Sequence, residues 1–425
     1  MLVSDEGVDV TVQRDAGEST WPGARHEQRA WTTNPDLHGP SGRRPGHADR
    51  VLTEITVEVP PHIADHAVRL SADTRAVCEE AAQQIIALDA GPGRYLSSLA
   101  EFLTRSESVA SSRIERVYAD MDDLARASVG DDASDAAVRT IAATRALREL
   151  TDGSDGGAPL TEAAILEAHS VLLAGDLLEG RSAGSYRTQQ NWIGGSDFSP
   201  RDAVHVPPPP GLVGALMGDL VRLANREDVP AVALAAIVHG QFEAIHPFND
   251  GNGRIGRGLI SAVLRRRGTT RRVVIPVAAV MLADVDTYFG RLADYRAGDA
   301  DALVDYVARS AITAAEAAEE SATRLAELSA RWDAQVSARR GSAARTLLAG
   351  LLDQPILDIA AIEAVTGVSR PRAYDAIAAL TDADVVHEIT GHGRNRIWVV
   401  SDVMDELSAL EGRIGSRARP SSRWR

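Results

Sequence analysis

Residues 246–257 gather the residue types that phosphate chemistry needs. This stretch reads His246-Pro247-Phe248-Asn249-Asp250-Gly251-Asn252-Gly253-Arg254-Ile255-Gly256-Arg257. Because Pro247 ends the preceding helix, we expect the imidazole of His246 to lie at a rigid helix end, where it could act as a general base. The residues Gly251 to Gly253 let the backbone approach a ligand closely. Their N–H groups, with the N-terminus of the next helix, predict an anion-binding site.

Three charged side chains complete this pattern. Arg254 and Arg257 are three positions apart on the predicted second helix, so both can bind phosphate oxygens from neighbouring faces. Asp250 supplies a hard carboxylate, which suits Mg²⁺ held against phosphates. A base, a metal carboxylate, an anion site and two arginines together indicate phosphoryl or nucleotidyl transfer.

The composition narrows the chemistry further. The 425 residues include 45 basic residues, and no lysine occurs in the sequence, so all of these are arginine. Walker-A loops, kinase-type lysine clamps and Schiff-base catalysis are therefore excluded, because each requires an amine. The formal net charge of −15 argues against a protein that coats nucleic acid over its whole surface, although one local basic face remains compatible with it.

The apolar periodicity predicts a mainly α fold with two folded units plus tails. Helices are expected at about 134–150, 161–175, 212–226, 230–245, 254–266 and 301–338, so the polar stretch lies between two apolar helices. Residues 1–50 are expected to be a mostly disordered lead. Residues 184–195 are expected to form a short β-hairpin, and the proline run 206–211 a stiff extended entry to the next helix.

A change of composition near residues 339–342 predicts a boundary. Beyond it, three helices followed by two strands indicate a winged helix-turn-helix at 344–412, and 413–425 reads as a basic tail. If this unit binds duplex DNA, the basic groups in the expected positions are Arg370, Arg372, Arg394 and Arg396. The alternative is a protein-interaction or dimerisation module, and a homodimer is compatible with it.

The sequence contains no segment typical of a membrane or secreted protein. No apolar run reaches the ~20 residues of a membrane helix, and the first residues are acidic where a secretory signal would be basic and then apolar. A single cysteine, Cys78, excludes an internal disulfide. We therefore expect a cytoplasmic protein without membrane contact.

The stretch from His246 to Arg257 closely resembles the motif of the Fic (filamentation induced by cAMP) family of protein adenylyltransferases. The family motif is His-Pro-Phe-x-Asp/Glu-Gly-Asn-Gly-Arg-x-x-Arg, and the sequence matches all nine fixed positions. The resemblance covers roughly residues 51–335. It implies an N-terminal helical part at 51–150 with an inhibitory helix, and a catalytic core at 151–338.

The resemblance implies an enzyme that transfers AMP from ATP, with Mg²⁺, to a Ser, Thr or Tyr hydroxyl of a protein. His246 would deprotonate that hydroxyl, and Asp250 would bind the metal. The residues implied in ATP binding are Phe248, Gly251, Asn252, Gly253, Arg254, Ile255, Gly256 and Arg257, together with Tyr288 and Phe289 near the adenine. The predicted hairpin resembles the family's flap, where Gln190, Asn191, Trp192, Ile193 and Gly194 would dock an extended target segment by adding a strand.

A second motif implies regulation. The segment from Ser111 to Glu115 resembles the family's inhibitory motif, Ser/Thr-x-x-x-Glu followed by Gly or Asn, whose glutamate pairs with the second motif arginine. Here Arg116 stands where the family has Gly or Asn. The alternative for Glu115 is an ordinary solvated helix residue.

Other functions remain open from the sequence. His239, Glu243 and His246 have metal-ligand spacing on one helix face, which a zinc hydrolase would use, but that assignment gives the glycine loop and its arginines no role. The same site could instead remove AMP or transfer another phosphate-containing group. A further alternative is a DNA-binding regulator whose core senses nucleotide.

Overall fold

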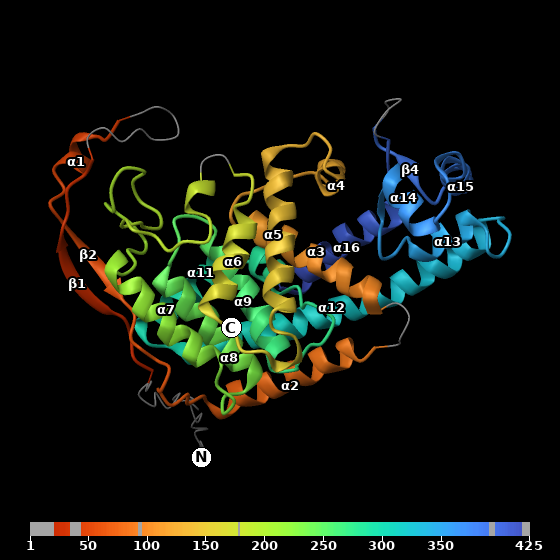
Figure 1. Ribbon diagram of the computed structural model, residues 1–425. Coiled ribbons are helices and arrows are strands. Elements are labelled where there is room, and N and C mark those ends of the chain that lie inside the picture. Colours follow the sequence, from red (N-terminus) through yellow and green to blue (C-terminus); the bar gives the residue numbers. More distant parts are fainter. Residues whose placement is uncertain (1–20, 35–43, 92–95, 177–178, 391–395, 419–425) are drawn as a thin grey trace, which may run out of the picture.

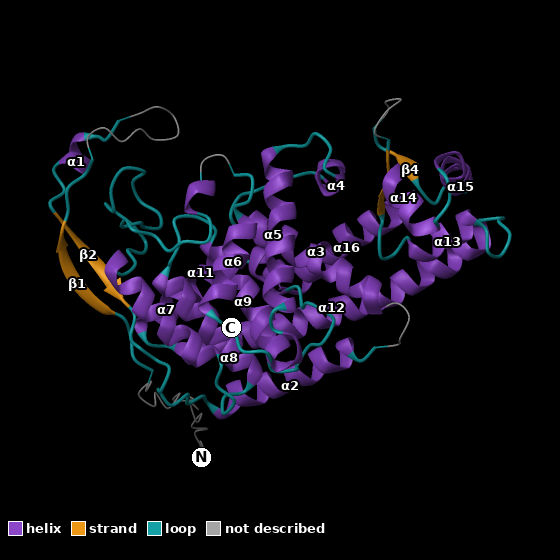
Figure 2. Cartoon of the chain, in the orientation of Figure 1, coloured by secondary structure: helices purple, strands orange, loops and turns teal. Residues whose placement is uncertain are grey.

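The computed structural model describes residues 21–34, 44–91, 96–176, 179–390 and 396–418. Within these residues the fold is mainly helical, with sixteen α-helices and five short strands (Figures 1 and 2). No helix among them is long and apolar enough to cross a membrane. The predicted mainly α fold is confirmed.

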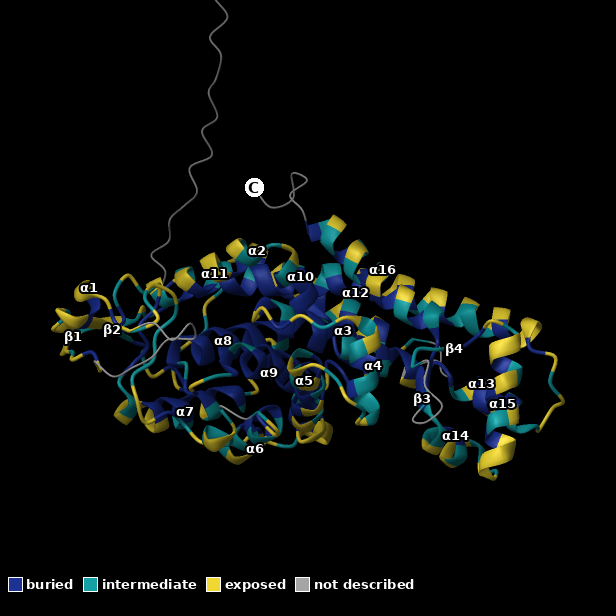
Figure 3. Cartoon of the chain, turned by 90° about the horizontal axis from the view of Figure 1, so that it is seen from above, coloured by how far each residue is buried: buried dark blue, intermediate teal, exposed yellow. Residues whose placement is uncertain are grey.

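Two buried helices lie at the centre and carry the polar stretch between them. α8 (Ala231–Ile245) is apolar on nearly all sides, and every residue from Val232 to Ile245 is buried. α9 (Asn252–Arg266) packs against α8 and is buried over almost its whole length. Figure 3 shows both helices within the layer of buried residues. A helix that is hydrophobic all round requires such a central position.

The surrounding helices close the core around this pair. Their bounds are α2 Ala72–Asp89, α3 Leu96–Ile114, α4 Met121–Val129, α5 Asp135–Asp152, α6 Glu162–Leu172, α7 Pro210–Ala224, α10 Val277–Ala283, α11 Val285–Ala297 and α12 Ala300–Gln335. Several begin at side chains that accept a hydrogen bond from the first turn, such as Ser134 in α5 and Thr161 in α6. The six predicted helices are all present. The proline run is extended only as far as Pro209, because Pro210 is the first residue of α7.

The prediction of a disordered lead is wrong for the part of it that the structure describes. β1 (Arg25–Ala30) pairs with β2 (Glu54–Val59) in an antiparallel ladder, and α1 (His47–Arg50) lies between them. The apolar side of β2 packs against Val206, and Trp31 meets Trp192 edge-to-face with ring centroids 5.7 Å apart. This long-range burial stabilises a segment whose own composition is poor in core residues. Residues 1–20 and 35–43 lie outside the described residues.

Residues 184–195 do not form the predicted hairpin. They form an irregular loop in which Ile193 makes an isolated antiparallel bridge with His205. The side chains of this loop donate to backbone carbonyls of neighbouring segments, and these contacts hold the loop in place without a strand ladder. Gly194 and Gly195 take positive φ angles of 74° and 72°, which turn the chain before the return segment.

The C-terminal module lies at one end of the molecule, opposite β1 and β2 (Figure 1). It contains α13 (Ala343–Gly350), β3 (Ile356–Asp358), α14 (Ile359–Thr366), α15 (Arg370–Asp382), β4 (His387–Glu388) and β5 (Ile397–Val399). The three strands form an antiparallel sheet in the order β3-β5-β4. The predicted helices and strands of this region are therefore present. Arg394 lies outside the described residues.

The predicted basic tail is wrong for its first residues, because α16 (Ser401–Ala418) continues through them. α16 returns from the module and packs along α10 and α12. Arg413 donates to Ser321 and pairs with Glu406, and Arg417 pairs with Glu320. These contacts with α12 and within α16 hold Arg413 and Arg417 on the helical body. Residues 419–425 lie outside the described residues.

Candidate active site

The loop between α8 and α9 is held in a fixed shape by its own side chains. α8 ends at His246, which adopts a left-handed conformation with φ 48° and ψ 61°, and α9 is preceded by Gly251 with φ 82°. The side-chain oxygen of Asn252 accepts a hydrogen bond from the Phe248 N–H at 2.9 Å, and its amide nitrogen donates to the Phe248 carbonyl at 2.8 Å. The buried Asn252 therefore closes the loop, while the N-terminus of α9 faces the site.

His246 projects from this helix end with a small exposed fraction. Its side chain is 15% exposed, and its Nδ1 lies 3.9 Å from the carboxylate of Glu243. Burial, together with the neighbouring positive charges of His205, Arg187 and Arg296, lowers the pKa of His246 to about 3. The imidazole is therefore neutral at physiological pH, which is the form that a general base needs.

Arg187 binds the backbone at the C-terminal end of α8. This residue was not identified from the sequence. Its Nε donates to the His246 carbonyl at 2.8 Å, and its NH2 group donates to the Pro208 carbonyl at 2.5 Å. The Arg187 N–H also donates to the Pro247 carbonyl at 2.9 Å. A C-terminal helix end leaves carbonyls without helical partners, and a buried guanidinium satisfies them here.

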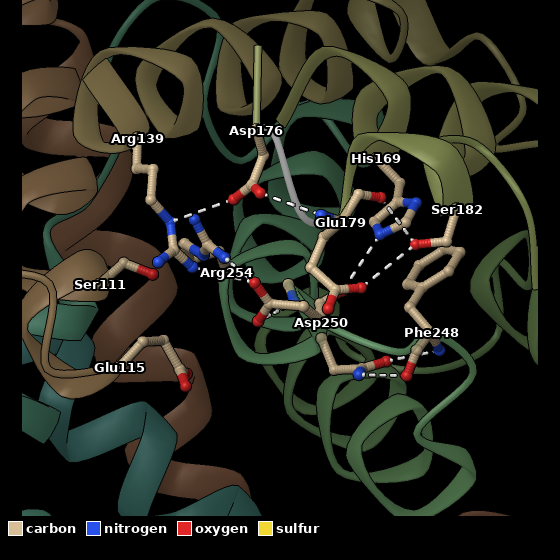
Figure 4. Close-up of polar contacts among 12 residues, drawn as sticks. Ser111, Glu115, Arg139, His169, Asp176, Glu179, Ser182, Phe248, Asp250 and Arg254 are labelled. Atoms are coloured by element: carbon tan, nitrogen blue, oxygen red, sulfur yellow. Dashed lines mark hydrogen bonds and ion pairs between the residues drawn. The ribbon is translucent and has the colours of Figure 1, made fainter. Parts of the chain in front are cut away.

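His169 of α6 supports the other side of the loop (Figure 4). Its Nδ1 accepts from the Gly184 N–H at 3.0 Å, which leaves Nε2 to donate to the Asp250 carbonyl at 3.1 Å. Its ring stacks on Phe248 with centroids 3.7 Å apart. Burial lowers the pKa of His169 to about 4, so the ring stays neutral. Phe248 is completely buried, and its side chain belongs to this stack.

Asp250 lies between two arginines (Figure 4). Its Oδ2 is 2.9 Å from Arg139 of α5 and 3.2 Å from Arg254 of α9, and Oδ1 accepts from the Gly251 N–H at 2.7 Å. Arg139 also lies 3.7 Å from Asp176. Arg254 is buried, and its NH1 and Nε atoms have no hydrogen-bond partner among the described residues. No sequence pattern pointed to Arg139, which lies 111 positions from Asp250.

Arg257 is held by the two residues of the second motif. Its Nε donates to Ser111 Oγ at 2.8 Å, and its NH2 group donates to the Ser111 carbonyl at 2.9 Å and to Glu115 Oε1 at 2.7 Å. A Cβ added at Gly253 would collide with the Glu115 carboxylate. The carboxylate therefore lies directly against the first turn of α9, where an anion is stabilised by the helix N-terminus.

Arg116, which stands where the inhibitory motif has Gly or Asn, adopts the left-handed conformation that these two residues favour. α3 ends at Ile114, and Arg116 has φ 60°, with its N–H donating to the Arg113 carbonyl. Left-handed backbone is the usual C-terminal cap of a helix and favours Gly or Asn. Arg116 takes this conformation nonetheless, and Glu115 still reaches Arg257.

The remaining residues predicted to bind ATP differ in how far they are buried. Tyr288 is fully buried, with its hydroxyl 3.0 Å from His239 Nε2 and 3.5 Å from Arg257, whereas Phe289 is 47% exposed. Ile255 and Gly256 are buried in α9. Among the described residues no three His, Cys, Asp or Glu side chains could hold a metal ion together, so the zinc alternative finds no support.

The side chains of the predicted flap donate to backbone carbonyls. Gln190 donates to the Pro207 carbonyl at 2.8 Å, Asn191 donates to the Phe248 carbonyl at 2.9 Å, and Trp192 donates to the Ser196 carbonyl at 2.7 Å. Asn191 therefore ties the 184–195 loop to the α8–α9 loop. Residues 184–195 therefore lie beside the α8–α9 loop, without hairpin strands.

Part of the chain that contains this site matches a known protein family. Residues 159–264, which include α8 and the loop to α9, match the model of the Fic/DOC family. This region of the chain is therefore similar to the Fic/DOC family. The matched region includes His246, Asp250, Arg254 and Arg257. Ser111 and Arg139 lie before it in α3 and α5, and Glu115 directly follows α3.

The chain is also similar to proteins named as protein adenylyltransferases. The chain is 30% identical over 175 residues to a probable protein adenylyltransferase of Aquifex aeolicus, covering 41% of this chain and 51% of that protein. It is 37% identical over 116 residues to the protein adenylyltransferase Fic of Drosophila erecta, covering 26% of this chain and 21% of that protein. The chain thus spans about half or less of the length of these relatives. A crystal structure of a Fic family protein from Desulfovibrio desulfuricans aligns with a TM-score of 0.49 and 20% identity, over 78% of this chain and 97% of that one.

Proposed function

We propose that the chain is an Mg²⁺- and ATP-dependent protein adenylyltransferase that transfers AMP to a Ser, Thr or Tyr hydroxyl. The observation that carries this proposal is the placement of a neutral His246 and of two buried arginines, Arg254 and Arg257, around one helix N-terminus. The similarity of the chain to relatives named as protein adenylyltransferases also supports it.

The nucleotide would bind where the Glu115 carboxylate now lies. The N–H groups of Asn252 to Arg254 have no acceptor within α9, because they belong to its first turn, and they suit the α- and β-phosphates. Arg254 and Arg257 would hold the outer phosphate oxygens, and the unpartnered nitrogens of Arg254 leave donors for this purpose. Ile255, Gly256 and Phe248 shape the loop from the core. Tyr288 and Phe289 remain proposed neighbours of the adenine.

His246 would act on the target and not on the nucleotide. The target hydroxyl gives its proton to the imidazole, and its oxygen forms the new bond to the α-phosphorus. The bond from that phosphorus to the bridging oxygen of the β-phosphate breaks, and pyrophosphate leaves. Arg187 holds the backbone of His246, so the base keeps one position during the reaction.

Asp250 fits the role of Mg²⁺ ligand. Its carboxylate is 36% exposed and lies at the N-terminus of α9, and magnesium is commonly bound through one or two carboxylates plus substrate phosphates. When bound, the cation would neutralise phosphate charge. Asp250 now pairs with Arg139 and Arg254, which are the cations it would share with the nucleotide phosphates.

Glu115 would inhibit the enzyme through its contact with Arg257. A carboxylate and a phosphate compete for the same planar guanidinium, since both accept two parallel hydrogen bonds. Ser111 binds the other edge of Arg257 and fixes its position. An ATP γ-phosphate therefore reaches Arg257 only when Glu115 leaves.

The loop 184–195 would dock the target segment, as the flap of the family does. Its Ile193–His205 bridge and its hydrogen bonds to Pro207 and Phe248 give it a fixed course beside His246. An extended target segment could add to such a segment through its backbone. AMP removal, or transfer of another phosphate-containing group, would use the same residues.

A second candidate function concerns the C-terminal module, which we propose to be a winged helix-turn-helix that contacts duplex DNA. Arg370 and Arg372 are exposed on the first turn of α15, the third helix of the module. Arg396 is a weaker candidate, because it pairs with Glu388 and lies over Trp398. A gel-shift titration of the full chain at two salt concentrations tests this function. Loss of binding in Arg370→Gln/Arg372→Gln but not in Arg75→Gln supports it, and no binding at low salt contradicts it.

The experiment for the proposed enzyme is mass spectrometry of lysate proteins incubated with ATP, Mg²⁺ and the Glu115→Gly variant. We expect AMP on Ser, Thr or Tyr side chains, and none after incubation with Glu115→Gly/His246→Ala. A different phosphate-containing adduct would support the alternative group transfer. Loss of pre-existing AMP adducts would support AMP removal instead.

A further inference from the structure

A cavity of about 250 Å³ lies where the C-terminal module and α16 meet the helical body. Helices α3, α4 and α5 line one side, and the start of β3, the segment before it and α16 line the other. No residue of the α8–α9 loop lines it. The cavity is therefore separate from the proposed ATP site.

Most of its wall is apolar, with Phe102 of α3, Ile356 of β3 and Leu407 of α16 among its residues. A cavity of this size accommodates a small organic body, and apolar walls with a few polar groups are the usual lining of ligand sites. The apolar part alone would accept many molecules. The charged residues make it selective.

Those charged residues are predominantly positive. Three arginines line the cavity, Arg105, Arg145 and Arg148, against the single carboxylate of Glu101. Arg148 already pairs with Glu101. Arg145 is exposed at its edge. A net positive cavity is notable in a chain whose formal net charge is −15.

Arg105 carries the argument. Its NH1 atom is buried and has no hydrogen-bond partner among the described residues. Burial lowers the pKa of Arg105. The negative charge of Glu101 opposes this shift, and the positive charge of Arg148 adds to it. A buried guanidinium nitrogen without a partner is unfavourable, and an anion that pairs with it removes this penalty.

We propose that this cavity binds a small organic anion with an apolar body, whose carboxylate or phosphate pairs with Arg105. The apolar body would lie against Phe102, Ile356 and Leu407. A planar guanidinium can donate two parallel hydrogen bonds to either anion, so the shared chemistry is an anionic head on an apolar chain.

The test titrates the full-length protein with octanoate, octyl phosphate and octanol by isothermal titration calorimetry. We expect an anion to bind wild type at least about tenfold more tightly than octanol, because only the anions can pair with Arg105. Comparison of octanoate with octyl phosphate distinguishes the two head groups. Equal binding of octanol and both anions, or no binding of either anion at millimolar concentration, would overturn the proposal.

Variants then assign the anion to Arg105. Arg105→Met should weaken anion binding at least about tenfold without changing octanol binding, whereas Arg105→Lys should retain part of it. Arg75→Met, on an exposed face of α2, is the matched control and should bind as wild type does. Unchanged anion binding in folded Arg105→Met would contradict the assignment. Because these measurements record binding only, they stand or fall independently of AMP transfer.

Discussion

Glu115 Oε1 lies 2.7 Å from the NH2 group of Arg257, although 142 positions separate the two residues in the chain. Arg257 is 1% exposed, whereas the Glu115 side chain is 37% exposed. The arginine is therefore fixed by its surroundings, and the glutamate is the partner that can move away. This asymmetry supports the proposal that Glu115 acts as a removable block and not as part of the core.

Glu115→Gly should increase labelling of target proteins, because it frees Arg257 for the γ-phosphate. We expect an increase of about 5- to 150-fold, which corresponds to a coupling of about 1–3 kcal/mol. The assay is incorporation of label from α-³²P-ATP. Glu167→Gly, at an exposed position of α6, is the control for the glycine substitution and should label as wild type does. Equal labelling by wild type and Glu115→Gly would remove the inhibitory assignment.

Arg116→Gly should strengthen the same block. Left-handed backbone costs a non-glycine residue ~1–2 kcal/mol, and glycine loses part of this gain through chain entropy, so the free energy of unfolding should rise by about 0.5–1 kcal/mol. Basal labelling should fall, because the end of α3 is then held more firmly. Urea unfolding and labelling are measured together. Arg116→Ala keeps the unfavourable φ and should show neither change; stabilisation by alanine would contradict this explanation.

The labelling rate should not depend on the ordinary titration of histidine. The pKa of His246 is lowered to about 3, so its neutral form is complete above that value and is lost only as the pH falls through it. In the Glu115→Gly background we expect a flat rate between about pH 5.5 and 7.5. An acid limb with a midpoint near 6.5 would contradict the lowered pKa of His246.

Asp250→Asn should lose activity mainly through the metal. The amide is a weaker ligand for Mg²⁺, and it also weakens the pairing with Arg139 and Arg254. We expect wild-type labelling to require Mg²⁺ and the variant to need far higher Mg²⁺ concentrations. A titration of Mg²⁺ against labelling rate measures this. Full activity of either protein in excess EDTA would contradict the metal role.

Glu107 predicts a pH dependence of stability. This carboxyl is buried in α3, with one oxygen accepting from the Ala278 N–H at 2.8 Å, and burial raises its pKa from 4.5 to about 8. The folded state therefore keeps a proton that the unfolded state releases, so wild-type stability falls as the pH rises from 4.5 towards 8. Glu107→Gln should gain stability relative to wild type over this window, by up to a few kcal/mol. Unfolding at pH 5 and pH 8 tests it, with Glu167→Gln as the exposed control; an equal difference at both pH values would contradict it.

Local sequence patterns predicted the helices well and the supporting contacts poorly. Apolar periodicity was sufficient for α8 and α9, because their burial depends on their own residues. The ordered strand β1 was missed, because it is stabilised by β2 and by Trp192, which are remote in the sequence. The hairpin was predicted wrongly for a related reason. Gln190 and Asn191 donate to the Pro207 and Phe248 carbonyls, and the local sequence pattern does not indicate these contacts with other segments.

The site shows the same division. The residues from His246 to Arg257 are contiguous in the chain, so the sequence alone was enough to predict that they form one site. Arg187, His169 and Arg139 come from separate elements and have no distinctive spacing, yet they hold His246 and Asp250 in place. Buried polar residues on apolar faces, such as His169 in α6, were the only signal available.

Transfer of AMP is tested most directly by following the α- and γ-phosphates of ATP in reactions with the Glu115→Gly protein. Parallel reactions contain α-³²P-ATP or γ-³²P-ATP, and Glu115→Gly/His246→Ala is run beside each. Transfer of AMP predicts that protein becomes labelled from the α-phosphate only, that the γ-label appears in pyrophosphate, and that the double variant labels nothing. Protein labelled from the γ-phosphate, or α-labelling that persists without His246, would contradict the account.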